Sequence, residues 1–370
     1  MAVASDLRTL QTDNLELIFV GQKNDKNAGV ITAGDSQITS YLVHAGKFRR
    51  FHSLSLIRQL FNVWPNLLNI RDGFLIVLGF FESFFLLLRL RPDVIFFKGG
   101  FVVVPIGYAA RLLRIPYITH DSDALPGLAN RLIAKGARYN AVAHAGVTYY
   151  PKAKTVVTGI PLSHEYAERQ NQGQARYKEL LDIPAGSTML FIYTGTQGAR
   201  IVDDALTSVV PRLLERYSHL YIVQVFGRLN EQRMDKRYGG LSKDMARRVR
   251  KLSFIDNAYD YIAAADIIIG RAGATSMAEF ATVGRACIIV PAEQLTGGHQ
   301  LMNAQLLAKE HAIVIARELH LADSLRSSVE HLIADKQARH RLAKTIQTFA
   351  TTDASKRIAE LIVSIKPAVK

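Results

Sequence analysis

Short apolar runs bounded by Gly, Pro or Asp alternate along this chain with longer helical patterns, and this alternation constrains the fold more than any other feature. The runs that we predict as buried strands are Leu15–Gly21, Asp93–Phe97, Pro116–Thr119 and Lys154–Gly159 in the first half, then Met189–Thr194, Leu220–Phe226, Asp266–Gly270 and Ala286–Val290. The helical patterns between them include Gly107–Leu113, Asp203–Arg216 and Gly298–His311. Strands separated by helices of this length indicate βαβ units and parallel sheets.

A segment containing Gln, Gly and Pro, Gly159–Gly186, separates the two series of strands. We therefore predict an α/β fold of two doubly wound, Rossmann-like domains, residues 1–160 and 161–350, with residues 351–370 forming a helix that packs back on the first domain. Ligands of such domains are expected at the carboxyl ends of the strands. The chain opens on a helical pattern, Met1–Leu10, so we expect the strand and loop that normally begin such a domain to be missing upstream of Met1.

The chain is strongly basic, with 46 Lys and Arg against 32 Asp and Glu and a net charge of +14. This favours a polyanionic partner: nucleic acid, a phosphorylated substrate or an anionic membrane. The basic cluster Arg228–Lys251 contains one aromatic residue, Tyr238, and is most simply a solvated helix face, so nucleic acid is not predicted as a partner. The only cysteine, Cys287, excludes a disulfide framework and a Cys-based zinc site, and it fits a reducing compartment.

One apolar segment, Phe74–Leu88, resembles a membrane-spanning helix but is too short for the ~20 residues that a span requires. Gly79, Glu82 and Ser83 fall on one face of the predicted helix. The helix is either buried, or packed on the sheet with aromatic surface left for a bilayer, and no span is predicted. The arginines placed to meet lipid head groups are Arg58, Arg71, Arg89 and Arg91.

Two small-residue loops follow strands in the second half of the chain. The first consists of Gly195, Thr196, Gln197, Gly198 and Ala199. The second consists of Arg271, Ala272, Gly273, Ala274, Thr275 and Ser276 and enters a helix that contains Glu279. Free amides at the start of this helix suit a diphosphate, and the Glu279 carboxylate could accept hydrogen bonds from two ribose hydroxyls. The alternatives are a tight strand-to-helix turn for the first loop and a Thr/Ser helix cap for the second.

A third loop, Thr296–Ala304, is polar and enters another helix. Gln300 and Asn303 share one helical face, and their amides suit sugar hydroxyls because each offers donors and an acceptor. Solvated polar residues in a first helical turn are the alternative.

In the first half, two loops follow neighbouring strands. Lys98, Gly99 and Gly100 could hold a phosphate, while His120, Asp121 and Asp123 are candidate bases for activating a hydroxyl. The alternative is a structural hydrogen-bond network. No metal site is predicted, because no second His lies at ligand spacing.

Together these motifs resemble the MurG-type glycosyltransferases of family 28. The resemblance runs over nearly the whole chain, in blocks at Gly46–Phe51, Arg91–Pro105, Ile115–Arg131, Thr158–Pro161, Gly195–Ala199, Phe254–Ile269, Arg271–Phe280 and His299–Ala304. It implies a two-domain GT-B fold and an inverting enzyme that needs neither metal nor other cofactor. Such an enzyme transfers N-acetylglucosamine from UDP-N-acetylglucosamine to undecaprenyl-linked lipid I, giving lipid II of peptidoglycan biosynthesis. The family works as a peripheral protein at the cytoplasmic face of the bacterial membrane, which would give Phe74–Leu88 and its flanking arginines a role.

The resemblance also implies roles for individual residues. Gly273–Ser276 would bind the UDP diphosphate, Glu279 the ribose and the Ile255 backbone the uracil. Thr196 and Gln197 would lie beside the diphosphate. The residues expected to contact the donor sugar are His299, Gln300 and Asn303, and those expected to face the acceptor are Lys98, Gly99, Gly100, His120, Asp121, Asp123 and Asn130.

This chain departs from the family pattern in four places. The family's first glycine-rich loop, which ends in Gly-Gly-His and supplies a proposed base, is absent from this sequence. The family's Gln pair is His299-Gln300 here, the Arg after its Gly-Asn-Pro turn is Ser163, and its His-Glu-Gln-Asn loop corresponds to residues 120–123. The alternatives to a lipid I transferase are therefore another lipid-directed transferase of the family and a non-catalytic UDP-sugar-binding protein.

Overall fold

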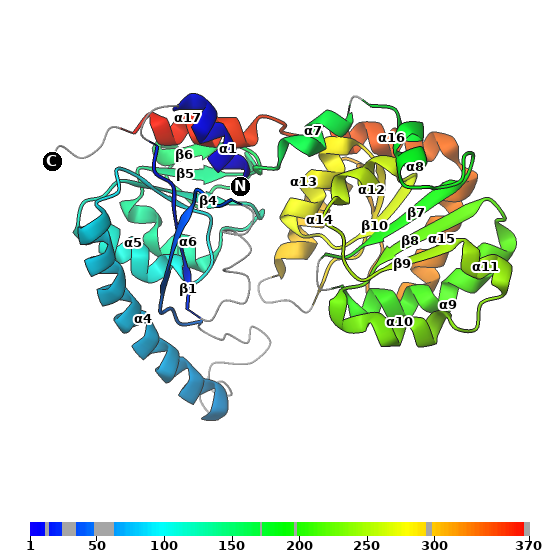
Figure 1. The fold of residues 1–370 in the computed structure, drawn as a ribbon, viewed down its shortest axis with the longest axis horizontal. Coiled ribbons are helices and arrows are strands. Elements are labelled where there is room, and N and C mark those ends of the chain that lie inside the picture. The colour runs from blue at the N-terminus through cyan, green and yellow to red at the C-terminus, as the bar shows by residue number, and fades with distance from the viewer. Residues whose placement is uncertain are drawn as a thin grey trace. The chain divides into compact units, whose positions relative to one another are not determined.

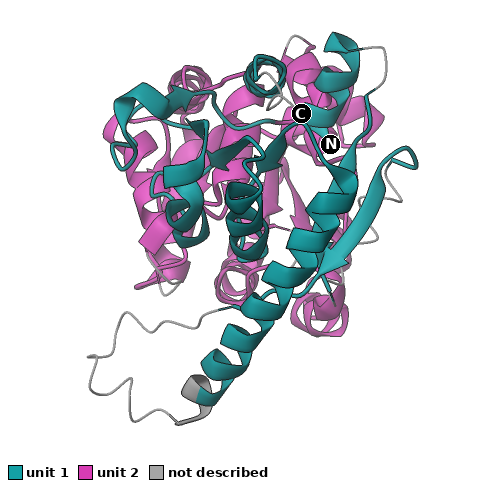
Figure 2. Ribbon diagram, turned by 90° about the vertical axis from the view of Figure 1, so that its left-hand side faces the viewer, with its two compact units in different colours: residues 1–161, 353–370 teal, residues 162–352 magenta. Residues whose placement is uncertain are grey.

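The computed structural model describes residues 1–11, 15–23, 35–47, 63–170, 172–195, 198–293 and 298–365, and the side chains of all of these except 63–66. The chain divides into two compact units (Figure 2). Unit 1 comprises Met1–Pro161 together with Asp353–Lys370, and unit 2 comprises Leu162–Thr352. Both units are α/β and their sheets are parallel, which confirms the predicted fold class.

Unit 2 is built on a six-stranded parallel sheet in the order β12-β11-β10-β7-β8-β9. The strands are β7 (Thr188–Tyr193), β8 (Leu220–Val225), β9 (Val249–Leu252), β10 (Ile267–Gly270), β11 (Ala286–Ile289) and β12 (Val314–Ile315). Counted from β7, the order is the 3-2-1-4-5-6 order of a doubly wound domain. The chain direction across the sheet therefore reverses between β7 and β10, which is where such domains bind ligands.

Helices cover both faces of this sheet (Figure 1). Buried apolar side chains lie on either side of it: Phe191 and Ile268 belong to one hydrophobic cluster, whereas Leu190 and Ile267 belong to the other. The helices are α7 (His164–Gln170), α8 (Gln174–Leu180), α9 (Arg200–Arg216), α10 (Glu231–Tyr238), α11 (Lys243–Arg247), α12 (Ala258–Ala264), α13 (Ala274–Val283), α14 (His299–Lys309), α15 (Leu321–Ala334) and α16 (Lys336–Gln347).

Unit 1 contains two parallel sheets among its described residues. The larger has the order β3-β4-β5-β6, and the smaller pairs β1 with β2. The strands are β1 (Ile18–Gln22), β2 (Thr39–Val43), β3 (Ile95–Phe97), β4 (Tyr117–Asp121), β5 (Tyr139–Val142) and β6 (Thr155–Val157), and the helices are α1 (Ala2–Leu10), α4 (Val63–Leu90), α5 (Val103–Leu112), α6 (Leu128–Ile133) and α17 (Ala354–Val363). Helix α17 from the end of the chain packs against α1 from its beginning (Figure 1).

Among the residues that the structure describes, four strands were not predicted from the sequence patterns. Strands β5 and β9 each contain polar residues where an apolar run was sought: Asn140 in β5, and Arg250 and Lys251 in β9. Asn140 is fully buried, where its Oδ1 accepts a hydrogen bond from Thr119 Oγ1 at 2.8 Å. Strand β2 exposes Thr39, Ser40 and Leu42, and β12 has two residues, so neither produces a recognisable apolar run.

The polar face predicted within Phe74–Leu88 lies on helix α4 and packs against other segments of unit 1. Glu82 accepts hydrogen bonds from the Lys23 ammonium at 2.7 Å and the His44 backbone amide at 2.7 Å, and its Oε1 lies 2.8 Å from His44 Nδ1. Burial alone would raise the pKa of Glu82, but these partners lower it to about 2. An added Cβ at Gly79 would lie 1.8 Å from the His44 carbonyl oxygen, so the helix approaches the chain there as only glycine permits.

The opposite face of α4 is exposed and apolar. Phe74 is 73% exposed and Phe85 is 65% exposed. The remaining exposed apolar residues follow helical spacing along the same face: Leu67, Ile70, Val77, Leu78, Phe81 and Leu88. Within the described chain, Leu67–Leu90 of this helix is long and apolar enough to cross a membrane by length and composition alone. Its two faces differ, however, because Asp72 and Ser83 are buried against unit 1.

The two glycines of α4 provide a test of this packing. We expect Gly79→Ala to destabilise the protein by ~1–3 kcal/mol, because the new methyl group must displace the helix from the His44 carbonyl. Gly73→Ala is the matched control, since nothing lies within 4 Å of its added Cβ, and it should stabilise the helix by ~0.5–1 kcal/mol. Urea unfolding of both variants measures the difference, and equal changes would contradict the packing.

Candidate active site

The loop after β7 lies at the switch point of the unit 2 sheet. Gly195 and Gly198 have positive φ values of 97° and 73°. A Cβ on Gly198 would lie 2.1 Å from the Phe226 carbonyl oxygen at the end of β8, so no other residue fits. Two predicted site residues of this loop, Thr196 and Gln197, lie outside the described residues. Glycine is therefore required at position 198, because the chain after β7 passes close to the end of β8.

The neighbouring loop leads from β10 into the N-terminus of α13. Gly273 is the N-cap, and the first helical hydrogen bond runs from the Met277 amide to the Gly273 carbonyl at 2.9 Å. The amides of Ala274, Thr275 and Ser276 therefore have no partner within the helix. Because these amides form the positive end of the helix dipole, they favour an anionic ligand.

Glu279 lies in the second turn of α13 and is half-buried. Burial raises its pKa to about 7, and a hydrogen bond from the Tyr166 hydroxyl opposes that rise. Its Oε2 atom is inaccessible to solvent and has no hydrogen-bond partner. A buried carboxylate oxygen without a partner costs free energy unless a ligand hydroxyl supplies one.

Two more buried polar atoms without partners occur on the elements that flank this switch point. They are Thr194 Oγ1 at the end of β7 and His299 Nδ1 at the start of α14. Buried polar groups of folded proteins are nearly always hydrogen-bonded. Three such atoms, directly after β7, in α13 and at the start of α14, indicate a site suited to a polar ligand.

The predicted sugar-binding amides make internal contacts. Gln300 Oε1 accepts a hydrogen bond from the Ala292 amide at 3.0 Å, and Asn303 Nδ2 donates to the Ala272 carbonyl at 3.1 Å. Asn303 is buried, and its hydrogen bond fixes the loop that precedes α13. Ile255 follows β9 and packs against a core cluster. In this state, Gln300 and Asn303 hold the loops of the site in place.

In unit 1, the predicted residues Lys98 and His120 meet at the carboxyl end of the sheet. Strands β3 and β4 are in register at Phe97 and Thr119, which places Lys98 beside His120. Lys98 Nζ lies 3.2 Å from His120 Nδ1 and donates to Ser122 Oγ at 2.9 Å. His120 Nε2 lies 2.9 Å from the Gly159 carbonyl oxygen and donates to it.

These contacts make His120 a neutral structural link. Burial, with Lys98 as the next cause, lowers the pKa of His120 to about 3, and the side chain is inaccessible to solvent. Burial also lowers the pKa of Lys98 to about 8. Both ring nitrogens of His120 have partners, so the geometry favours the hydrogen-bond network over the role of a base. Gly99 and Gly100 follow with positive φ values.

Asp121 and Asn130 complete the same network. Asp121 accepts hydrogen bonds from the Tyr150 hydroxyl at 2.6 Å, the Gly127 amide at 2.9 Å and Asn130 Nδ2 at 3.1 Å. Asn130 Nδ2 also donates to the His120 carbonyl at 2.9 Å. Burial raises the pKa of Asp121 despite these bonds. Both side chains hold the loop after β4, which leaves Asp123, half-buried, as the remaining candidate base of the three.

His144 belongs to the same edge and was not found from the sequence. It follows β5, and the Ala143 amide donates to the Asp121 carbonyl at 2.9 Å, which extends the β4–β5 ladder to this point. Burial lowers the pKa of His144, and the negative charge of Asp123 opposes that shift. The sequence signal for His144 is its position two residues after the strand Tyr139–Val142, at the same edge of the sheet as Lys98 and His120.

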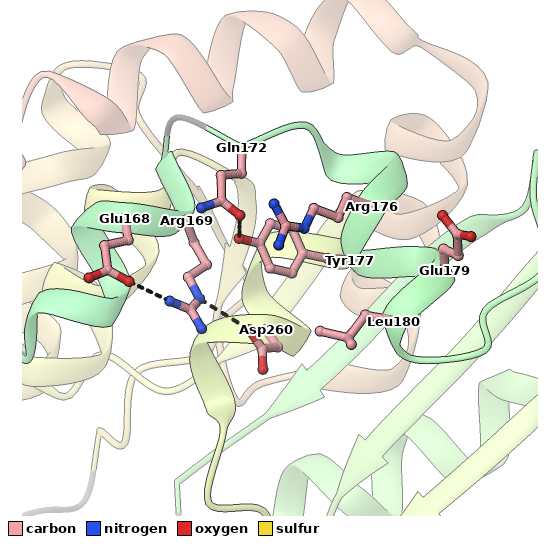
Figure 3. Close-up of a pocket in the computed structure, with 8 residues that line it drawn as sticks. All are labelled: Glu168, Arg169, Gln172, Arg176, Tyr177, Glu179, Leu180 and Asp260. Carbon is pink, nitrogen blue, oxygen red and sulfur yellow. Dashed lines mark hydrogen bonds and ion pairs between the residues drawn. The ribbon is translucent and has the colours of Figure 1, made fainter.

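A separate pocket of about 500 Å³ lies on unit 2 between α7, α8 and α12 (Figure 3). Its polar groups pair with one another: Arg169 with Asp260 at 3.1 Å and with Glu168 at 2.8 Å, and Tyr177 with Gln172 at 2.6 Å. It is lined by Glu168, Arg169, Gln172, Arg176, Tyr177, Glu179, Leu180 and Asp260, and by none of the predicted site residues. Across the described ranges, no three His, Cys, Asp or Glu side chains are grouped to hold a metal ion.

Two α/β units with parallel sheets, one of them doubly wound and carrying a helix N-terminus suited to an anionic ligand, place the chain among nucleotide-binding proteins with two Rossmann-like domains. The N-terminal domain of glycosyltransferase family 28 matches residues 7–141, and the C-terminal domain of that family matches residues 189–358. The chain belongs to glycosyltransferase family 28.

Similar proteins agree with this assignment. A Geotalea daltonii protein is 31% identical over 80% of this chain and 78% of its own length. It is named UDP-N-acetylglucosamine--N-acetylmuramyl-(pentapeptide) pyrophosphoryl-undecaprenol N-acetylglucosamine transferase. The crystal structure of Acinetobacter baumannii MurG has a TM-score of 0.70 at 20% identity, over 98% of this chain and 95% of that one. Neisseria meningitidis UDP-GlcNAc 2-epimerase bound to UDP-GlcNAc has a TM-score of 0.62 at 13% identity, over 94% and 99%. Both structures show the fold.

The neutral state of His120 can be tested directly. We expect its imidazole to remain neutral, with the proton on Nε2, throughout pH 5–8, because its pKa is lowered to about 3. Long-range ¹H–¹⁵N NMR on histidine-labelled protein measures this, and His120→Asn identifies the signal. A His120 signal that titrates near pH 6.5 would contradict the buried network.

Proposed function

We propose that this protein transfers N-acetylglucosamine from UDP-N-acetylglucosamine to undecaprenyl-linked lipid I, forming lipid II in peptidoglycan biosynthesis. The family membership and the names of its relatives support this activity. The single structural observation that carries it is the set of unpartnered buried polar atoms directly after β7, in α13 and at the start of α14, because that set suits a nucleotide sugar. The reaction is inverting and uses no metal or other cofactor.

Each element of the donor site has one chemical role in this proposal. The amides of Ala274–Ser276 bind the diphosphate, and the positive helix end stabilises the negative charge that grows on departing UDP. The Glu279 carboxylate accepts hydrogen bonds from the ribose hydroxyls. The Ile255 backbone meets the uracil, while Gly195–Gly198 allows the diphosphate to approach the chain closely. His299, Gln300 and Asn303 line the sugar subsite, with the orphaned His299 Nδ1 as the atom that a sugar hydroxyl satisfies.

The acceptor site lies at the carboxyl edge of the unit 1 sheet. Lys98, Gly99 and Gly100 bind the acceptor diphosphate, and Asp121 and Asn130 hold the loop after β4. The base that takes the proton of the acceptor hydroxyl is Asp123 or His144. Support comes from the electrostatic interaction of Asp123 with both Lys98 and His144, and from the lowered pKa of His144, which keeps its imidazole neutral at pH 7 as a base requires.

The membrane partner is the bilayer surface, met by the exposed face of α4 as a peripheral contact at the cytoplasmic face. Phe74, Phe81 and Phe85 enter the headgroup boundary, while Arg89 meets anionic head groups together with the exposed Arg71, whose guanidinium also pairs with Asp72 at 2.9 Å. Arg91 lies just beyond the helix, and Arg58 lies outside the described residues. The buried Asp72 and Ser83 on the other face support a helix that lies on the bilayer rather than one that crosses it.

Nucleic acid is not among the proposed partners. Cations of the basic cluster Arg228–Lys251 pair with carboxylates of unit 2. These pairs join Arg233 to Asp203 and Asp204, Arg237 to Asp204, Arg248 to Asp244 and Lys251 to Asp235. A charge that is already paired releases fewer counterions when it meets a phosphate backbone.

The activity is tested by UDP release in the presence of UDP-N-acetylglucosamine and lipid I. We expect UDP release to require lipid I, with lipid II as the product detected by mass spectrometry. Transfer to another lipid, such as diacylglycerol, would instead show a different lipid-directed transferase. UDP-sugar binding without turnover would show a non-catalytic binding protein.

The ribose assignment predicts a large effect of Glu279→Gln. Replacing the charged acceptor removes hydrogen bonds worth ~1.5–3 kcal/mol, so the KM for UDP-N-acetylglucosamine should rise at least tenfold. Steady-state kinetics at saturating lipid I measure it. An unchanged KM would show that Glu279 does not bind the ribose.

The base assignment predicts separate effects on turnover and donor binding. We expect the variant that removes the base, Asp123→Asn or His144→Gln, to lower kcat by ~10²–10⁴-fold while the KM for UDP-N-acetylglucosamine stays within twofold. Tyr149→Phe, at an exposed position in the segment that follows β5, serves as the control. If both variants keep wild-type kcat, the base lies elsewhere.

The membrane assignment predicts loss of vesicle binding when α4 loses its apolar face. Phe74→Glu combined with Phe85→Glu should weaken binding to phosphatidylglycerol vesicles at least tenfold, because each buried Phe contributes ~1.5–3 kcal/mol. Leu229→Glu, at a fully exposed position of unit 2, should leave binding unchanged. Vesicle co-sedimentation gives the comparison, and equal binding by all three proteins would disprove the assignment.

A further inference from the structure

Tyr166 of helix α7 contacts the buried carboxyl group of α13. It is 8% exposed, and its hydroxyl donates a hydrogen bond to Glu279. Its ring packs edge-to-face with Tyr259 of α12, with centroids 5.8 Å apart and planes at 88°. Helix α7, which carries this phenol, also packs against α12 and α13 (Figure 1).

The two oxygens of Glu279 are therefore not equivalent. The Tyr166 hydroxyl satisfies one of them, whereas Oε2 is buried and has no partner. No salt bridge to Glu279 occurs in the part of the chain that the structure describes. Burial raises the pKa of Glu279 by more than the Tyr166 hydrogen bond lowers it. The carboxyl group consequently carries a proton for part of the time near neutral pH.

The other titratable groups that face Glu279 are phenols. Tyr193 at the end of β7 has its pKa raised to about 12, by burial first and by Glu279 second. Burial also raises the pKa of Tyr166. Both phenols therefore stay neutral up to pH 9, and Glu279 is the group of this cluster that changes charge near pH 7.

We propose that Tyr166 is a positioning residue for the nucleotide-sugar donor, holding one oxygen of Glu279 so that Oε2 faces the ligand, and that donor binding requires loss of the Glu279 proton. This inference rests on the proposed function, in which the ribose hydroxyls are the donors that meet Oε2. A protonated carboxyl group has one fewer acceptor position to offer two hydroxyls than a carboxylate has. The donor thus binds the ionised form, and the proton is released to solvent.

The sign of the pH dependence follows from this coupling. Above the pKa of Glu279 the carboxylate is already formed and affinity is complete; as pH falls below about 7, affinity falls with the ionised fraction. The Tyr166 hydrogen bond lowers that pKa, so removing the hydroxyl raises it and moves the loss of affinity to higher pH.

The test is calorimetric titration with UDP-N-acetylglucosamine between pH 6 and pH 9, on the wild type, Tyr166→Phe, Tyr259→Phe and Glu279→Gln. The diphosphate of this ligand is doubly esterified and does not itself titrate in that range. We expect wild-type affinity to fall about tenfold for each pH unit below 7. Tyr166→Phe should bind about threefold to tenfold more weakly at pH 7 and approach wild-type affinity at pH 9.

The two other variants separate the phenol from its surroundings. Tyr259→Phe keeps the aromatic packing and should follow the wild-type profile, whereas Glu279→Gln should bind weakly at every pH. A Tyr166→Phe profile that matches the wild type overturns the inference, and so does an equal loss at every pH, which would show a merely structural role. Wild-type binding that does not vary with pH also overturns it while leaving the proposed function intact. A wild-type protein that does not bind the donor would refute the proposed function itself.

Discussion

The donor site of unit 2 depends on one close contact between a helix and a strand. A Cβ on Gly270, the last residue of β10, would lie 2.7 Å from the Phe280 ring, and Phe280 is fully buried. This contact holds α13 against the sheet, so its first amides and Glu279 lie beside the carboxyl end of β10. Hydrogen bonding of Asn303 to the Ala272 carbonyl then fixes the loop between them. Packing within unit 2 therefore positions both the helix dipole of α13 and the carboxyl group of Glu279.

Burial decides the chemistry of both candidate sites. In unit 1 it makes His120 neutral, and the hydrogen bonds to Gly159 and Lys98 occupy both ring nitrogens. In unit 2 it raises the pKa of Glu279 towards neutrality and leaves one oxygen for a ligand. Desolvation thus makes His120 unsuitable as a base, and it makes the charge of Glu279 sensitive to pH near 7.

Much of this arrangement is predictable from sequence, and the failures have physical causes. Apolar runs such as Leu220–Val225 are buried on both faces of a parallel sheet and therefore stand out in the sequence. Strand β5 does not, because the buried Asn140, whose Oδ1 accepts a hydrogen bond from Thr119, breaks the apolar pattern. That missed strand also concealed His144. The polar face of α4 was predicted from helical spacing, but its partners Lys23 and His44 come from distant positions in the chain.

The sequence by itself determined the fold class, the family and the loops that carry chemistry, because these depend on local periodicity and on short motifs after strands. Only the tertiary structure decided which polar atoms are shielded from water and which have partners. Those properties arise from segments far apart in the chain, as when Tyr166 of α7 meets Glu279 of α13. A carboxyl group in a motif can be recognised from its neighbours in sequence, but its protonation depends on its neighbours in space.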